Sequence, residues 1–138
     1  MNAEELELMY AEFLPWIDPE VEGFVAELSS IREVGFAYNI CVNFLLDGAI
    51  IGYVKYKYYH GEDHLTATDF VIGELSGEGI LRRYADDSLE IFLEYIYNCS
   101  TVATDPRIIY VYEQAGWKQS NDDPTLWIIH PGEFIRTT

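Results

Sequence analysis

Two side chains in this sequence are suited to moving a proton. Asp69 lies in the apolar stretch TATDFVIGE, residues 66–74. A carboxylate is costly there unless it is paired or faces a cleft, although an outward-facing or edge position also explains it. Tyr112 lies in a short helical segment and is suited to act as a general acid if its hydroxyl faces a cleft. Taken alone, a helical tyrosine is more often a packing residue.

A short loop, SGEG, lies between an expected strand and an expected helix. Backbone N–H groups around Gly77 and Gly79 could hold a phosphate at the start of that helix. Arg82 and Arg83 follow in its first turn and add positive charge. Glu78 opposes anion binding, and a plain turn is the alternative interpretation.

The polar loop HGEDH, residues 60–64, contains two histidines and two acids. Metal ligation needs a fixed spacing on one face, and a loop with a central glycine does not provide it, so no metal is expected. A solvated loop, or an acidic rim beside a ligand, fits better. Cys41 and Cys99 have no metal-binding spacing around them and are expected to be free, buried thiols.

Local signals predict the elements that would position these groups. Asp47-Gly48 between two β-rich stretches predicts a two-residue hairpin. Asp105-Pro106 and Gly116 are typical of the two ends of a helix. Asp18 as the N-cap and Pro19 at the first helical position predict the start of a second helix, although Gly23 weakens that prediction. The expected helices are 3–14, 17–28, 80–97 and 107–115, and the expected strands are 35–46, 49–59, 66–74, 100–104 and 125–130.

This order predicts an α/β (α+β) fold in which a mixed, mostly antiparallel sheet is flanked by helices on both faces. The strand–helix–strand unit of residues 66–104 predicts a crossover between parallel strands. At 138 residues, a single domain over residues 1–138 is expected. Tyr56, Tyr58 and Tyr59 are expected to be exposed, lining either a homodimer face or an acceptor cleft.

Charge is the strongest signal in the composition. Twenty-four acids against eight bases give a net charge of −16. This balance disfavours nucleic acid and anionic membranes and suits a cationic ligand or a basic partner, although solubility alone also explains it. No apolar run is long enough for a membrane span, and the acidic start MNAEELELMY does not look like a signal peptide. We therefore expect a cytoplasmic protein.

Four motifs in order resemble one known family. LDGAIIGYVKY, TDFVIGE, GEGI and TDP followed by YEQAGW are similar to motifs of the GNAT (GCN5-related) N-acetyltransferases, most of all the aminoglycoside 6'-N-acetyltransferase branch. Each motif is weak alone, but together they cover about residues 45–118 in the family's order.

The resemblance implies a GNAT-like domain that transfers an acetyl group directly from acetyl-CoA to a cationic, aminoglycoside-like amine. Asp69 would contact and help deprotonate the amine, and Tyr112 would protonate the departing thiolate. The acceptor would be held by Glu62, Asp63 and Asp69. The implied acetyl-CoA-binding residues are Phe70, Val71, Ile72, Gly77, Glu78, Gly79, Ile80 and Arg82.

Three departures from the family pattern leave a second hypothesis open. Ser76 and Leu81 replace a basic or amide residue and a small residue of the phosphate loop, which is also shorter. Only RIIYV separates Pro106 from Tyr112, where the family has a longer segment. No strand is found before the first helix. The alternative is therefore a degenerate GNAT-fold protein that binds a basic partner without normal CoA binding or catalysis. A third hypothesis, based on charge alone, is that the protein is an acidic mimic of nucleic acid.

Overall fold

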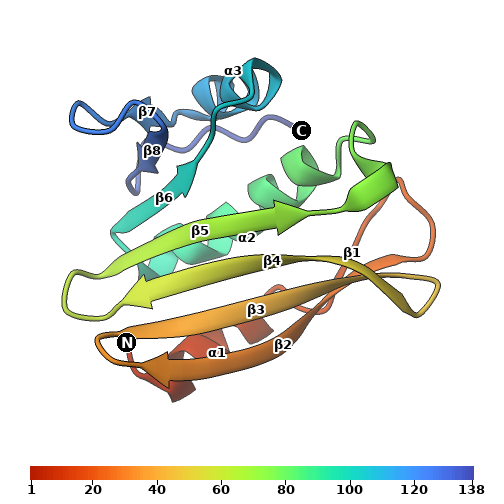
Figure 1. Cartoon of the computed structure of the whole chain (residues 1–138), viewed down its shortest axis with the longest axis horizontal. Coiled ribbons are helices and arrows are strands. Elements are labelled where there is room, and N and C mark those ends of the chain that lie inside the picture. Colours follow the sequence, from red (N-terminus) through yellow and green to blue (C-terminus); the bar gives the residue numbers. More distant parts are fainter.

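The turn at Asp47-Gly48 joins two long strands, as predicted. Both residues have positive φ, 50° and 86°, as this tight hairpin turn requires. The turn connects β3 (Ala37–Leu46) to β4 (Ala49–Tyr59). The computed structural model describes residues 1–138, and Figure 1 shows these two strands near the centre of the sheet.

The sheet has eight strands in the order β1-β2-β3-β4-β5-β6-β8-β7. Its pairs are antiparallel except β5 with β6, which are parallel and are joined through α2. The mixed, mostly antiparallel sheet and the parallel crossover are therefore confirmed. The remaining elements are α1 (Ala3–Ala11), β1 (Trp16–Ile17), β2 (Phe24–Val34), β5 (His64–Val71), a 3-10 turn (Gly73–Leu75), α2 (Ile80–Tyr95), β6 (Asn98–Val102), α3 (Pro106–Ala115), β7 (Lys118–Gln119) and β8 (Leu126–Ile129).

The helix predicted over residues 17–28 is wrong. Asp18 starts a turn, in which its carboxylate accepts the Glu20 N–H at 2.9 Å, and Gly23 has a φ of 81° that ends the turn. Phe24 and Ala26 then alternate toward the core as the first residues of β2. The capping signal was real but belongs to a turn, and strand pairing with β3 overrode the local helical pattern.

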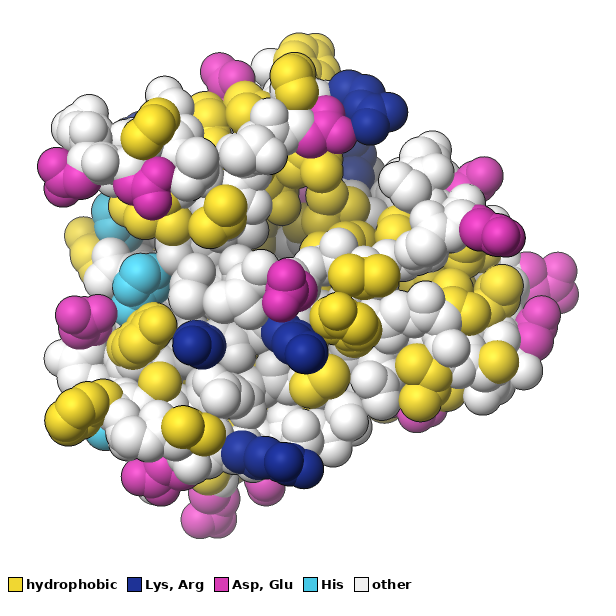
Figure 2. All heavy atoms as spheres, in the orientation of Figure 1, with side chains coloured by type: hydrophobic (Ala, Val, Ile, Leu, Met, Phe, Trp, Pro, Cys, Tyr) yellow, Lys and Arg dark blue, Asp and Glu magenta, His cyan; other side chains and the backbone are white.

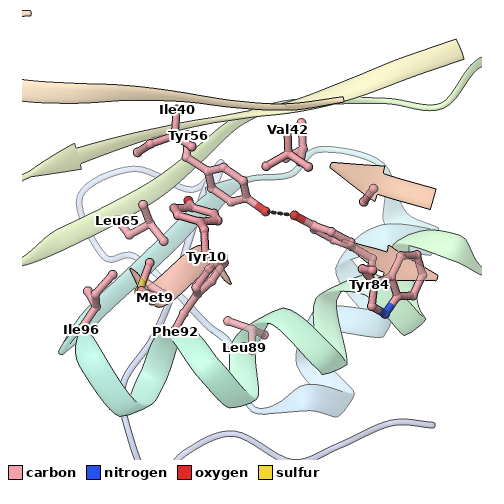
Figure 3. Packing of buried hydrophobic residues seen from close by; sticks show 14 of the residues in the cluster. Met9, Tyr10, Ile40, Val42, Tyr56, Leu65, Tyr84, Leu89, Phe92 and Ile96 are labelled. Carbon is pink, nitrogen blue, oxygen red and sulfur yellow. Dashed lines mark hydrogen bonds between the residues drawn. The ribbon is translucent and has the colours of Figure 1, made fainter. Parts of the chain in front are cut away.

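Helices α1 and α2 both lie against the same face of the sheet, and no helix covers the other face of β2 to β5 (Figure 1). Tyr10 of α1 and Phe13, just after that helix, both pack edge-on against Phe92 of α2, with ring centroids 5.3 and 5.2 Å apart. Tyr56 and Tyr58 of β4 also point to this side and are buried, so their predicted exposure is wrong. Figure 3 shows Tyr56 meeting Tyr84 of α2 inside the core. The helix-free side of β2 to β5 is called the open face below.

A bulge in β5 decides which face receives Asp69. Asp69 pairs with Lys55 of β4, and Ala67 pairs with the next residue of β4, Tyr56. Thr68 therefore has no paired residue on β4 and is an extra residue in β5. Without the bulge, the two-residue period of a strand would place Asp69 on the helix-covered side with Ala67. With it, Asp69 is exposed on the open face. The pairing of β5 with β6 also ends at Ala67, and the two strands separate from there.

Candidate active site

Two hollows open where β5 and β6 separate. The inner cavity, about 210 Å³ in volume, lies between α2, α3 and strands β4 to β6. The outer groove, about 740 Å³, follows the end of β5 and the start of α2. They share Phe70, Leu81 and Ile108 and are therefore adjoining parts of one site. Figure 2 shows an apolar-lined hollow between the part that holds α3 and the rest of the sheet.

The start of α2 offers unpaired donors to the outer groove. The N–H groups of Gly77, Gly79, Ile80, Leu81 and Arg82 have no acceptor within the chain, and no side chain caps the helix. Gly77 and Gly79 have φ values of 97° and 77°, which side-chain-bearing residues rarely adopt. Such a set of donors at a helix N-terminus suits an anion.

The groove also gathers positive charge. Arg82, Arg83 and Arg107 line it, which is three of the eight basic residues in a chain of net charge −16. Arg107 comes from the first turn of α3, where it also pairs with Asp105 at 2.9 Å. An anionic ligand in this groove would meet arginines from two helices. The three predicted strand residues Phe70, Val71 and Ile72 line the groove too, as do Gly77, Gly79, Ile80 and Arg82, but Glu78 does not.

Arg83 is not free to bind a ligand. Its Nε and Nη2 donate to the two oxygens of Asp18, both at 2.9 Å, and its Nη1 donates to Glu20 at 2.8 Å. Burial alone would raise the pKa of Asp18, but the hydrogen bonds from Arg83 and from backbone N–H groups lower it below its usual value. The pair joins the turn before β2 to the start of α2, and it brings the Glu20 carboxylate into the groove.

Beyond Ala67, strand β5 has a partner only on its β4 side. Its pairing with β4 continues to Val71, whereas β6 has separated. The backbone of residues 68–71 therefore has a free edge beside both hollows. An extended ligand could pair with this edge as an added strand does. Gly52 permits the close packing on the β4 side, because a Cβ there would lie 1.9 Å from the Val71 carbonyl oxygen.

Tyr112 lines the inner cavity from α3 and is 8% exposed. Burial raises the pKa of its hydroxyl, partly offset by the Thr101 side chain beside it, so the group stays protonated at neutral pH. The Trp117 ring packs on it, with centroids 5.1 Å apart. A fixed, protonated hydroxyl in an apolar cavity is a suitable proton donor.

Asp69 lines the same cavity from the open face, so both predicted proton-transfer groups line one cavity. Its cross-strand neighbour is Lys55. Glu62 and Asp63 are not brought to this place, because they precede Asp69 by seven and six residues along the extended strand β5, about 20 Å or more. Asp63 instead accepts hydrogen bonds from the Tyr58 hydroxyl and the Tyr97 N–H, at 2.8 and 3.0 Å.

Sequence reasoning missed Glu20 and Arg107 as residues that line the groove, and Asp18 as the residue that holds Arg83. Asp18 and Asp105, which precedes Arg107 by two residues, carried signals, but these were interpreted only as helix capping. Leu81 was identified as a departure, and the structure places it where the two hollows join. No group of three or more His, Cys, Asp or Glu side chains is arranged to hold a metal ion. None of the helices has the length and apolar character needed to cross a membrane.

Comparisons with solved structures identify the fold. AAC(6')-Ib, an aminoglycoside acetyltransferase, matches with a TM-score of 0.53 and 18% identity over 72% of this chain and 70% of its own. A spermidine N-acetyltransferase SpeG chimera from Vibrio cholerae and hSSAT matches with 0.55 and 12% identity, over 95% and 78%. Tetrahymena GCN5 matches with 0.52 and 13% identity over 71% of each chain. No protein-family model and no curated protein matches the sequence. The chain therefore has the GNAT acetyltransferase fold.

Proposed function

We propose that this chain, which has the GNAT fold, is an acetyl-CoA-dependent N-acetyltransferase. One observation carries the proposal: the groove and the inner cavity are adjoining, and they connect the open N–H groups of α2 to the buried Tyr112 hydroxyl. This arrangement matches the shape of a CoA thioester, which has an anionic end and a reactive, uncharged end. The neighbour AAC(6')-Ib is described in complex with coenzyme A.

Each group of residues would have a separate role in binding or in proton transfer. The N–H groups from Gly77 to Arg82, with Arg82 and Arg107, hold the diphosphate, and the free edge of β5 pairs with the pantetheine arm. Asp69 holds the acceptor amine and takes a proton from it. The amine nitrogen then attacks the thioester carbonyl carbon, and the carbon–sulfur bond breaks. Tyr112 gives its proton to the departing thiolate, so no covalent intermediate on the protein is needed.

Calorimetric titration with acetyl-CoA tests the proposal. We expect micromolar binding that weakens as salt is raised, because arginines face the phosphates. Arg107→Ala should weaken binding about 5-fold, as expected for one partly screened charge contact. Lys118→Ala removes the same charge outside the groove and should change little. If no binding is detected even at low salt, the alternative gains support: a GNAT-fold acidic protein that binds a basic partner.

The acceptor proposed from the sequence is a cationic amine, with aminoglycoside-like compounds as the first candidates. One structural neighbour is described with both coenzyme A and kanamycin. The −16 net charge would attract such an acceptor at long range. Glu62 and Asp63, however, lie too far from Asp69 to contact an acceptor that is bound there.

One observation favours a second candidate, an amine that also carries a carboxylate. Arg32 and Lys57 lie in one cross-strand row of the open face, and Lys55 lies opposite Asp69. The structure pairs Arg83, Arg107, Arg136 and Lys118 with acids but leaves these three basic side chains without an acidic partner. Figure 2 shows basic side chains exposed on this face.

Substituting Lys55 distinguishes the two acceptors. If the acceptor is polycationic, Lys55→Gln should lower its KM about 3- to 5-fold, because a repulsive charge next to the site is removed. If the acceptor carries a carboxylate, the same substitution should raise KM by a similar factor. Initial rates with kanamycin, spermidine and an α-amino acid amine would be compared, with Lys118→Gln as the charge-matched control. An unchanged KM for every active acceptor would exclude Lys55 from acceptor binding.

A further inference from the structure

The inner cavity extends farther than an acetyl group needs. The Tyr112 hydroxyl lies beside Thr101, which pairs with Ala67 across the sheet. The lining continues to the next pair on the same face, Leu65 and Cys99. Two residues along a strand add about 7 Å. The cavity therefore runs past the tyrosine into the core.

Its size also exceeds that of an acetyl group. The volume of about 210 Å³ can be compared with apolar cavities of about 150 Å³ that bind benzene. An acetyl group has about half the non-hydrogen atoms of benzene.

Most of the polar side chains that line the inner cavity already have partners or carry no charge. Fifteen of the twenty lining residues are hydrophobic. The hydroxyls of Tyr56 and Tyr84 bond to each other at 2.7 Å, as Figure 3 shows, and the Ser88 hydroxyl donates to the Ala85 carbonyl at 3.3 Å. Burial raises the pKa of the Cys99 thiol to about 12, so it stays uncharged. These polar groups have partners or carry no charge, so they do not require a polar ligand. Two other lining residues differ from them: the Trp117 Nε1–H is buried without an acceptor, and Asp69 lies at the exposed edge of the cavity.

One face of α2 forms a wall of the cavity along its length. Leu81, Ala85, Ser88, Leu89 and Phe92 are spaced three or four residues apart or lie next to one another, so they share this face. Phe92 follows Leu81 by eleven residues of helix, a rise of about 16 Å. Leu81 also lines the outer groove, so a chain entering beside it would have a continuous apolar wall.

We propose that the preferred donor is a CoA thioester with an unbranched, apolar acyl chain of about four to six carbons, whose tail fills the cavity beyond Tyr112. This inference rests on the proposed function and concerns its donor. The chemistry balances as it does for acetyl transfer. A nitrogen–carbon bond forms, the carbon–sulfur bond breaks, the amine loses a proton and the free thiol gains one.

The test compares acetyl-, butyryl- and hexanoyl-CoA by calorimetric titration of the unmodified protein. Each buried methylene should strengthen binding, so hexanoyl-CoA should bind at least about 10-fold more tightly than acetyl-CoA. Equal affinities would overturn the inference and leave the proposed function intact. Absence of binding by all three thioesters would instead overturn the proposed function.

Two variants locate the chain in the cavity. Ala85→Leu places extra volume in the cavity wall and should bring the hexanoyl-to-acetyl affinity ratio close to one. Glu94→Leu adds the same side chain on the exposed side of α2 and should keep the ratio of the unmodified protein. If Ala85→Leu does not fold, as a thermal scan would show, Ser88→Val fills the same face by a smaller volume. A hexanoyl preference that survives the filling variant would place the chain elsewhere and overturn the inference.

Discussion

Replacing Tyr112 with phenylalanine will lower turnover about 100-fold or more and leave the affinity for acetyl-CoA nearly unchanged. The hydroxyl is the proposed proton source for the thiolate, while the ring that packs on Trp117 is retained. Stability should fall by only about 1 kcal/mol, as expected for the loss of one buried hydroxyl contact. Steady-state rates and calorimetry on the same preparation separate the two effects.

The pH dependence provides a second readout for Tyr112. Because burial raises its pKa, the hydroxyl should stay protonated through the ordinary tyrosine range near 10. If turnover falls at alkaline pH because Tyr112 loses its proton, the fall should occur above that pH range in the unmodified protein. The same fall should be absent in Tyr112→Phe.

Tyr110→Phe is the matched control, because Tyr110 lies two residues earlier on α3 and is 60% exposed. Its turnover should stay within about 2-fold of the unmodified protein, as for most exposed substitutions. Equal turnover in Tyr112→Phe and the unmodified protein would remove Tyr112 from the mechanism. The hydroxyl of Tyr84, which lines the same cavity, would then be the next to test.

Asp18→Ala should destabilise the protein by about 3–5 kcal/mol, the largest stability effect that we expect from a single change. The Asp18 side chain is completely buried, and the Arg83 side chain is 10% exposed. Removing the carboxylate leaves a buried guanidinium with only the exposed Glu20 as a partner. Since domains of this size are stable by about 5–15 kcal/mol, urea unfolding should show a clearly lower midpoint.

The controls separate the buried pair from the exposed one. Glu20→Gln should lower the free energy of unfolding by less than about 1 kcal/mol, because the Glu20 side chain is 69% exposed. The double variant Asp18→Ala/Arg83→Met should recover part of the loss, since no buried charge then lacks a partner. If Asp18→Ala and Glu20→Gln cost the same, the buried pair is not the main link between the turn and α2.

Acid should weaken this link in a defined direction. The pKa of Asp18 is lowered in the folded protein, so its pairing contributes fully above the ordinary carboxyl range and is lost as the pH falls through the folded value. The stability difference between the unmodified protein and Asp18→Ala should therefore be present at neutral pH and shrink in strong acid. Urea unfolding at several pH values would measure it.

Features set by neighbours in the chain could be predicted from the sequence. The Asp47-Gly48 turn and the Asp105 to Gly116 limits of α3 follow from backbone preferences of the residues themselves. The Gly77–Gly79 loop likewise depends on φ values that glycine adopts easily. The helix expected over 17–28 failed because the same cap residues also form turns.

The sequence by itself determined the order of most elements, the glycine loop, and the location of Asp69 on a strand and of Tyr112 on a helix. The tertiary structure decided which of these groups meet. The bulge at Thr68 placed Asp69 on the open face, and the extended strand β5 keeps Glu62 and Asp63 about 20 Å or more from it. Asp18 and Arg83 are 65 residues apart in sequence, yet they form a buried pair. A local pattern fixes backbone conformation, but the side on which a side chain points depends on strand partners and packing, which are distant in the sequence.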